Sequence, residues 1–544
     1  MHMEYRISDN LAALKPSAIR EILKAPKDAD TISLAAGNPA PETFPVADLA
    51  RFAADIFAND STTALQYGAT DGYEPLRRAV AERQKTVWGI GKSVAEGDGF
   101  NDTTIIVSGG NQGIELAAKV FCNEGDTVIC ENPTFIGGLN AFRSCGYNTV
   151  GVPIEEDGMN VEALEETIKA TPNAKLLYII PTFQNPAGIT TSLEKRKAIY
   201  EVCKKYGLMI LEDNPYGELR FAGEEIPTIK SFDTEGLVIY CSSFSKILSA
   251  GMRVGFVVAP EEVAAKMVVA KQSEDVHTNQ FFQMLCYKFM TECDLDAHIA
   301  MIREVYGRKC RLMLECLEKE LPASVTFTRP EGGLFLWCTL PEHIDVAEFI
   351  NRAKEQLVFV VTGKAFNCDE NAGTHSFRLN YSMPSDENID QGIKTLRNAP
   401  DLLKAKWNDN ITVVSFDQFK DLDEAYKLVH ANDPKLWTKK FGVEITEPFD
   451  WVAWDTWSEI QWYMLEELRS KDSEMKGVGL NFRKNVQIQH WGMMTDLNKL
   501  AVQQLRSCRV NQVFTMQEKL DKDELSGAIY GGPAIHGKMV QEMP

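Results

Sequence analysis

Residues 238–259 read VIYCSSFSKILSAGMRVGFVVA, and in this segment two strand-length apolar runs flank a polar turn. Lys246 follows the first run, close to the hydroxyl groups of Ser243 and Ser245, and Arg253 stands just before the second run. A lysine in such a place can form a Schiff base with an aldehyde once burial and nearby cations lower its pKa. The hydroxyl groups and the arginine can then bind phosphate oxygens of the same cofactor. The alternative interpretation is a helix start that carries a solvated lysine.

Short apolar runs alternate with helical patterns on both sides of this turn. The runs with strand character are Thr103–Val107, Thr127–Cys130, Leu176–Ile180, Leu208–Glu212, Val238–Cys241 and Val254–Val258. Helical spacing occurs in Ile114–Phe121, in Leu193–Tyr206 and in a long tract from Val263 through Glu320. This order predicts βαβ crossovers and a largely parallel sheet, with ligands bound in the loops at the carboxyl ends of the strands.

Three further polar turns follow strand-length runs. Asp213 comes after Leu208–Glu212, and a protonated pyridine nitrogen would be a suitable partner for a carboxylate buried there. Asn185, within PTFQNPAG, can donate to a ring oxygen, and its bond to Pro186 can be cis. The Gly-rich turn of residues 108–113 opens a helix, whose N–H groups can bind an anion. Each turn taken alone is also ordinary turn chemistry.

The order in which these motifs occur resembles the class I and II aminotransferases of fold type I, over residues 5–398. Supporting segments in the same collinear order are SLAAGNP (33–39), LQYGATDG (65–72), ENPTF (131–135), PEGGLFLW (330–337) and FRLNYS (377–382). The resemblance implies an α/β fold with a mostly parallel sheet in a large domain and an α+β small domain. It also implies pyridoxal 5′-phosphate (PLP) as the cofactor.

The resemblance implies roles for individual residues. Lys246 would form the Schiff base and move the α-proton, Asp213 would hold the ring nitrogen, and Tyr216 would complete the catalytic set. The residues expected to bind the cofactor are Tyr67, Gly110, Asn111, Gln112, Phe135, Asn185, Asp213, Tyr216, Ser243, Ser245, Lys246 and Arg253. The residues expected to bind the substrate are Gly37, Asn185, Arg378 and Arg20. No metal site is expected.

More detailed expectations attach to several of these positions. Phe135 would stack on the cofactor ring, and Arg378 would hold the substrate α-carboxylate with bidentate geometry. Tyr67 would reach the phosphate site of a neighbouring subunit, which implies a homodimer with shared active sites. Lys15–Lys24 resembles the mobile helix of 2-aminoadipate and kynurenine aminotransferases, in which Arg20 would meet a distal carboxylate. A solvated charge on an amphipathic helix is the alternative for Arg20.

The implied activity is ping-pong exchange of an amino group between an L-amino acid and a 2-oxo acid, with glutamate and 2-oxoglutarate as one pair. One alternative is a PLP-dependent lyase or decarboxylase on the same fold, because the shared motifs do not decide which bond breaks. A cofactor-binding regulatory module is a further alternative. It is disfavoured, because the resemblance begins almost at Met1 and the C-terminal region shows no helix-turn-helix pattern.

Composition bounds the remaining possibilities. A formal net charge of −20 disfavours nucleic acid and membrane surfaces as partners. The 12 cysteines are scattered without a CxxC pair, which is typical of reduced thiols in a cytoplasmic protein. No signal peptide or membrane-spanning run is found in the sequence.

Four parts are expected along the chain. Residues 1–45 would form an N-terminal arm and part of the small domain, 46–290 the PLP-binding large domain, 291–398 the rest of the small domain, and 399–544 an extension. The extension is rich in tryptophan, and we expect it to be helix-rich, with a helix over Val452–Leu468. Its tryptophans would form either an aromatic core stripe or a docking surface, and we hypothesise a role in higher assembly.

Overall fold

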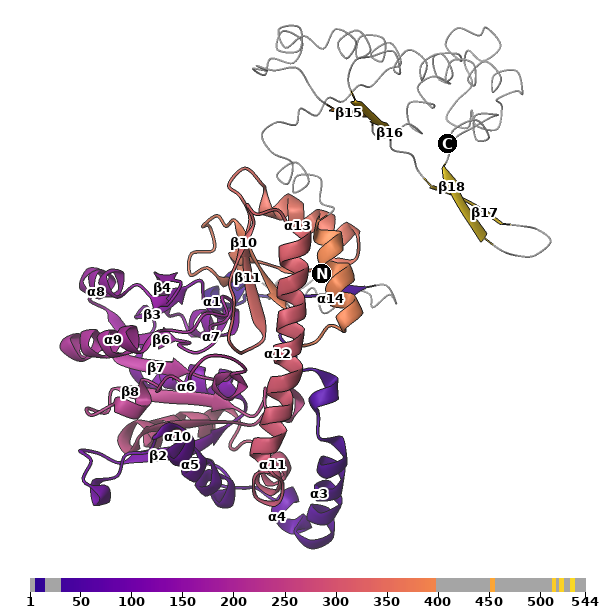
Figure 1. The fold of residues 1–544 in the computed structure, drawn as a ribbon. Coiled ribbons are helices and arrows are strands. Elements are labelled where there is room, and N and C mark those ends of the chain that lie inside the picture. The colour runs from indigo at the N-terminus through magenta and orange to yellow at the C-terminus, as the bar shows by residue number, and fades with distance from the viewer. Residues whose placement is uncertain are drawn as a thin grey trace. The chain divides into compact units, whose positions relative to one another are not determined.

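The computed structural model describes residues 5–14 and 31–397 together with four short segments near the C-terminus, namely 451–454, 511–514, 518–522 and 529–533. The chain divides into two compact units, Met1–Asn410 and Ile411–Pro544. Figure 1 shows the elements of each unit. The boundaries between the four parts expected from the sequence remain predictions.

An eight-stranded sheet lies at the centre of the first unit, with the strand order β2-β9-β8-β7-β6-β3-β4-β5. Its strands are β2 (Asp102–Val107), β3 (Thr127–Asn132), β4 (Asn148–Glu155), β5 (Gly158–Met159), β6 (Ala174–Ile179), β7 (Met209–Asp213), β8 (Val238–Ser243) and β9 (Gly255–Pro260). The neighbours from β8 to β4 pair in parallel, so the prediction of a largely parallel sheet is confirmed.

Strand β9 is antiparallel to both of its neighbours, β8 and β2. The connection from Ser243 to Gly255 is too short for a helical crossover, so the chain returns beside β8 in the opposite direction. Lys246 lies in this return. It therefore stands at the edge of the sheet where the parallel strands β6, β7 and β8 end.

Helices cover both faces of this sheet, which explains why its central strands are apolar on both sides. One core cluster joins the sheet to α6 (Gly110–Phe121), α7 (Ile136–Ser144) and α10 (Glu261–Glu274). The other joins it to α8 (Val161–Ala170) and α9 (Leu193–Tyr206). The elements that precede the sheet in the chain are α1 (Asp9–Ala13), α3 (Val46–Asn59), α4 (Ser61–Leu65) and α5 (Glu74–Trp88).

The single helical tract expected from Val263 to Glu320 is wrong, because the chain forms three helices there. After α10 come α11 (Gln280–Glu292) and α12 (Leu295–Glu320). Asn279 and Asp294 cap the second and third helices through their side-chain oxygens, and such caps mark new helix starts. Val276 has φ +64°, which the α-helix does not allow.

A smaller antiparallel sheet has the order β10-β11-β14-β13. Its strands are β10 (Thr326–Phe327), β11 (Phe335–Thr339), β13 (Val361–Thr362) and β14 (Ser376–Asn380), and it lies with α13 (Val346–Glu355) and α14 (Asp386–Arg397). Near the N-terminus β1 (Ile32–Ser33) pairs in parallel with β12 (Val358–Phe359). N-terminal and C-terminal pieces therefore meet in this part of the unit.

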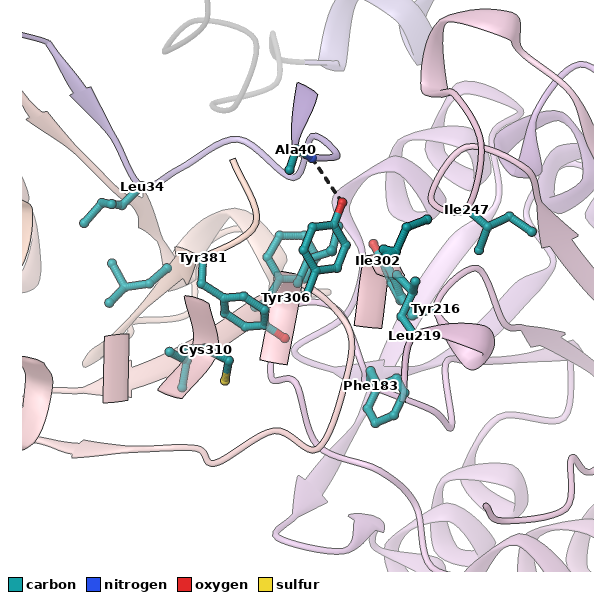
Figure 2. Packing of buried hydrophobic residues seen from close by; sticks show 14 of the residues in the cluster. Leu34, Ala40, Phe183, Tyr216, Leu219, Ile247, Ile302, Tyr306, Cys310 and Tyr381 are labelled. Carbon is teal, nitrogen blue, oxygen red and sulfur yellow. Dashed lines mark hydrogen bonds between the residues drawn. The ribbon is translucent and has the colours of Figure 1, made fainter. Parts of the chain in front are cut away.

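Helix α12 packs against both sheets through one large core cluster. Figure 2 shows Tyr306 of this helix, whose hydroxyl oxygen accepts a hydrogen bond from the backbone N–H of Ala40 at 3.0 Å. Tyr216 and Tyr381 belong to the same cluster. The core thus ties the segment around Ala40 to the loops at the carboxyl end of the large sheet.

In the second unit, β15 (Trp451–Trp454) pairs in parallel with β16 (Asn511–Phe514), and β17 (Glu518–Lys522) pairs in antiparallel fashion with β18 (Ile529–Pro533). The expected helix over Val452–Leu468 is wrong at its start, because residues 451–454 are a strand. Tryptophan and valine suit a paired strand at least as well as a helix. The other residues of that helix lie outside the described ones. No helix in the described ranges has the length and apolar character needed to cross a membrane.

Candidate active site

The site lies where β6, β7 and β8 end. Asn185 follows β6, Asp213 is the last residue of β7, and Lys246 follows β8. Because parallel strands end at one edge of a sheet, these three residues are brought together from three loops. Arg378 on β14 and Gly37 after β1 join them from the other part of the unit, since Arg378 bonds to Asn185 and Gly37 to Lys246.

The amine of Lys246 is partly buried and donates a hydrogen bond to the backbone oxygen of Gly37 at 2.7 Å. Burial lowers its pKa to about 8, with further lowering by the positive charges of Arg378 and Arg253. A substantial fraction of this lysine is therefore unprotonated under mildly basic conditions, which nucleophilic attack on an aldehyde requires.

Asp213 is buried, with 3% of its surface exposed. Desolvation raises the pKa of its carboxyl to about 7, although the hydroxyl of Tyr178 donates a hydrogen bond to Oδ2 at 2.8 Å and acts in the opposite direction. A cationic partner would lower the pKa of this buried carboxyl again, because a nearby positive charge stabilises the ionised form.

Asn185, Tyr216 and Arg378 form a chain of hydrogen bonds. Nη1 of Arg378 donates to Oδ1 of Asn185 at 2.7 Å, and Nδ2 of Asn185 donates to the hydroxyl of Tyr216 at 3.4 Å. The peptide bond between Asn185 and Pro186 is cis. Burial raises the pKa of Tyr216, so its hydroxyl stays protonated.

The guanidinium of Arg378 is buried and lies against two aromatic rings. It is 1% exposed, and its central carbon lies 4.0 Å from the centre of the Phe335 ring and 4.8 Å from that of Phe366. Nη2 donates to the backbone oxygen of Ala35 at 2.8 Å. Among the residues that the structure describes, nothing accepts a hydrogen bond from Nε. A buried N–H without an acceptor points to a ligand, and a carboxylate is the bidentate partner that arginine prefers.

The turn at the start of α6 forms a cradle for an anion. Oγ of Ser243 bonds to Oγ of Ser245 at 2.8 Å, and Nη1 of Arg253 lies 3.4 Å from the latter. Gly109 has φ +83°, a conformation that favours glycine, and a Cβ there would lie 2.1 Å from Nη2 of Arg253 in its present position. Gly110 then opens the helix, where the N–H groups of the first turn have no partner within the helix.

The remaining residues expected to bind cofactor or substrate differ in their positions relative to this cradle. The side chains of Asn111 and Phe135 meet over Gly137, where a Cβ would lie 2.3 Å from the Phe135 ring and 2.9 Å from Oδ1 of Asn111. Gln112 lies in the first turn of α6, but its side chain bonds to Lys271 and Glu274, behind the cradle. Tyr67 is 80% exposed. Arg20 lies outside the described residues.

Two buried groups at the site were not expected from the sequence. Tyr178 lies within β6 and reads as a core aromatic, so no sequence signal distinguishes it. Glu131 is the next-to-last residue of β3, and desolvation raises its pKa to about 8, against hydrogen bonds from the N–H of Ile180 and from Gln184. Glu131 belongs to the ENPTF segment, and its position directly after the apolar run Thr127–Cys130 is the sequence signal that could have singled it out.

A separate cavity of about 310 Å³ lies elsewhere, lined by Arg77, Gln84, Thr104 and other residues of α5 and β2, and none of the site residues lines it. Within the described ranges, no group of three or more His, Cys, Asp or Glu side chains could hold a metal ion. The chemistry available at the site is thus a partly neutral amine, a buried carboxyl, an anion cradle and a buried arginine with a free N–H. This set suits an aldehyde cofactor with a phosphate, and a substrate with a carboxylate.

Comparisons with known proteins agree with this chemistry. The family model "Aminotransferase class I and II" matches residues 29–396. Aromatic-amino-acid aminotransferase 1 of Thermococcus litoralis is 40% identical over 397 residues, covering 72% of this chain and 93% of that protein. The 2-aminoadipate transaminase of Thermus thermophilus is 38% identical over 389 residues, covering 71% and 94%. The structure of Pyrococcus horikoshii kynurenine aminotransferase in complex with PMP, KYN and KYA has a TM-score of 0.69 at 36% identity, covering 75% of this chain and 98% of that one.

Proposed function

Because this chain belongs to the class I and II aminotransferases and is a PLP-dependent enzyme, we propose that it transfers the amino group of an L-amino acid to a 2-oxo acid through a cofactor held by Lys246. The observation that carries this assignment is the state of the lysine. Its pKa is lowered to about 8 by burial and by two arginines, and its amine is fixed against Gly37.

The residues present fit PLP. Ser245, Arg253 and the N-terminus of α6 are donors that suit the phosphate, and the space next to Gly109 admits no side chain. Asp213 suits a protonated ring nitrogen, since its carboxyl is buried and its pKa is raised to about 7 by desolvation. Asn185 and Tyr216 are joined by a hydrogen bond that can open toward a ring hydroxyl.

When bound, PLP supplies an aldehyde carbon that joins the amino group of the substrate and a ring that accepts electrons from its α-carbon. Lys246 accepts the α-proton, for which a pKa of about 8 is close to the working pH. The carbonyl of Gly37 orients the amine for this transfer. Tyr178 holds Oδ2 of Asp213 in place and favours the ionised carboxylate.

Arg378 binds the α-carboxylate of the substrate through Nε and Nη2, between the rings of Phe335 and Phe366. Glutamate and 2-oxoglutarate form one substrate pair, and dicarboxylic, aromatic and long aliphatic amino acids are candidates for the other. The names of the relatives, which include aromatic, 2-aminoadipate and kynurenine aminotransferases, support this range. Arg20 is proposed to meet a distal carboxylate.

We also propose a homodimer in the cytoplasm, in which Tyr67 reaches the cradle of the other subunit. An 80% exposed tyrosine next to a protein surface that carries Leu65 at 73% exposure supports an interface there. The free thiols of the described cysteines suit a reducing compartment. The molecular mass in solution tests the dimer.

The test of the activity is a visible-absorbance titration of the PLP-loaded protein with L-glutamate alone. Loss of the cofactor band, followed by its return when a 2-oxo acid is added, is the expected result, and a panel of 2-oxo acids then ranks the substrates. Release of ammonia or carbon dioxide without that return would indicate a lyase or decarboxylase instead. Absence of any band after PLP is added would contradict the assignment of Lys246.

A further inference from the structure

Behind the anion cradle lies an ion pair between a buried lysine and a partly buried aspartate, which the proposed chemistry does not use. The side chain of Lys271, on α10, is completely buried, and its amine donates to both carboxylate oxygens of Asp275 at 2.7 and 2.8 Å. The same amine donates to Oε1 of Gln112 at 2.9 Å. Isolated buried charges are unfavourable, and this lysine has found three acceptors in the two side chains that face it.

Both partners of Lys271 also bond to Ser108, one to its backbone and the other to its side chain. Oε1 of Gln112 accepts a hydrogen bond from the N–H of Ser108 at 2.8 Å. Oδ2 of Asp275 accepts one from the hydroxyl of Ser108 at 2.6 Å. Ser108 therefore donates one hydrogen bond from its backbone and one from its side chain, and both go to side chains that also accept from Lys271.

Ser108 is the residue directly before Gly109, and its backbone oxygen lies 3.4 Å from Nη2 of Arg253. A Cβ at Gly109 would displace that guanidinium, and Gly255 has no room for a Cβ, because it would lie 2.9 Å from the Gly109 carbonyl carbon. The turn is thus packed so closely that a small shift of Ser108 would move Arg253 and the first N–H groups of α6 together.

We propose that Lys271 and Asp275 are positioning residues for the phosphate of the cofactor, acting through Gln112 and Ser108 on the turn at residues 108–110. The proposal rests on the function proposed above, because it requires that a phosphate binds in this cradle. The sequence predicts that Gln112 binds the cofactor, and the proposal gives its side chain a different role. The side chain fixes the turn by accepting a hydrogen bond from the N–H of Ser108.

The alternative is that the pair only stabilises the contact between α10 and α6, where Lys119 and Glu274 also bond at 2.6 Å. The two possibilities differ in what a substitution changes. A purely structural pair affects the free energy of unfolding and leaves the preference for a phosphorylated cofactor unchanged. A positioning pair changes that preference itself, because pyridoxal, which lacks the phosphate, does not use the turn.

The experiment compares the Kd of PLP with the Kd of pyridoxal for apoprotein of the full chain, by absorbance titration. In Lys271→Met and Asp275→Asn, we expect the Kd of PLP to rise about 10- to 100-fold, the size of effect that a small misplacement of binding groups produces, with a much smaller change for pyridoxal. Ser108→Ala leaves the ion pair intact and removes one of its links to the turn, so it should shift the same ratio in the same direction. If Lys271→Met does not fold, Ser108→Ala alone tests whether these contacts position the phosphate site.

Lys230→Met is a matched control. The side chain of Lys230 is as completely buried, and it pairs with Asp102 at 2.8 Å and Asp233 at 3.1 Å. Asp102 begins β2, whereas Ser108 follows the other end of that strand. This variant should lose stability and keep the wild-type ratio of the two Kd values.

Folded Lys271→Met and Ser108→Ala proteins with the wild-type ratio of PLP to pyridoxal affinity would overturn the proposal. Failure of the proposed function is a distinct result. It would appear as a wild-type protein that binds PLP no better than Lys246→Ala does.

Discussion

Replacement of Arg378 by lysine tests the proposed carboxylate site most directly. The variant keeps a positive charge but loses the planar fork. In the structure Nη1 donates a hydrogen bond to Asn185 and Nη2 donates one to Ala35, while Nε has no acceptor in the described part of the chain. A lysine has a single nitrogen, which cannot reach both of these protein acceptors and a bidentate substrate carboxylate.

The size of the effect follows from the bonds that are lost. A hydrogen bond to a charged group contributes roughly 1.5–3 kcal/mol, and lysine can replace one of the two bonds to the carboxylate. The loss of the other corresponds to a decrease of about 10- to 150-fold in kcat/KM for the amino acid. The loss should lie toward the upper end, because Arg378 is only 1% exposed and water cannot replace the missing donor.

The assay is the first half-reaction, followed as loss of the cofactor band at increasing concentrations of an L-amino acid. The same assay with the corresponding amine, which lacks the carboxylate, provides the internal comparison. We expect Arg378→Lys to slow the amino acid strongly and the amine little. Equal slowing of both compounds would refute the role of Arg378 as the carboxylate fork.

A matched control for this substitution is Arg220→Lys. Arg220 is also buried, at 5% exposure, and its guanidinium lies 4.7 Å from the centre of the Phe183 ring. Its charge is balanced by the protein carboxylates of Glu331 at 2.8 Å and Glu225 at 3.6 Å, although its Nε and Nη2 have no hydrogen-bond acceptor in the described part of the chain. This variant should change stability without changing the difference between the amino acid and the amine.

Three other predictions concern buried acids. Burial raises the pKa of Glu131 to about 8, so Glu131→Gln should change the free energy of unfolding near neutral pH by less than about 1 kcal/mol. Glu131→Ala leaves the Ile180 N–H unpaired, and it should lower the free energy of unfolding by about 1–3 kcal/mol, measured by urea unfolding. Tyr178→Phe should raise the pKa of Asp213 above about 7 and move the pH dependence of PLP affinity upward by about one unit, measured by absorbance titration. Because burial raises the pKa of Asp213 in the folded protein, its contribution to stability is full below about pH 4 and is lost as the pH rises through about 7, so the Tm of the Asp213→Asn apoprotein should fall less over that range than that of the wild type.

Local signals in the sequence were sufficient where both ends of an element are marked. The helix expected over Leu193–Tyr206 has these bounds in the structure, with Ser192 as its N-cap and Gly207, at φ +65°, as its C-cap. The long tract expected after Val263 is wrong as one helix, because Asn279 and Asp294 act as caps that begin new helices within it.

The expected fold is confirmed over the part of the chain that the family model covers. Its parallel core followed from the alternation of strands and helices, and this alone brings Asn185, Asp213 and Lys246 to one edge. The contribution of Arg378 and Gly37 from outside the large sheet followed only from the resemblance to known proteins, since no local pattern connects them to that edge.

Contacts that depend on register or on distant packing could not be read from the sequence. Tyr178 of β6 lies opposite Leu211 of β7, so Asp213 stands two residues further along and on the same face of the sheet. This relation exists only once the two strands are paired. In the same way, Lys271 and Gln112 are brought together by the packing of α10 on α6, and the sequence offers no sign of that contact.

The two arginines that lower the pKa of Lys246 have separate anionic partners in the proposed function. Arg253 faces the phosphate cradle and Arg378 faces the substrate carboxylate. Burial is the largest cause of the lowered pKa of Lys246, and the positive charges of the two arginines lower it further. An anion on Arg378 would cancel part of that repulsion, so the amine would become more basic when an amino acid is bound than before. Lys246 would therefore be most readily neutral while it awaits an aldehyde, and a stronger base when it must accept the α-proton. The same arginine that binds the substrate would in this way match the basicity of the lysine to each step.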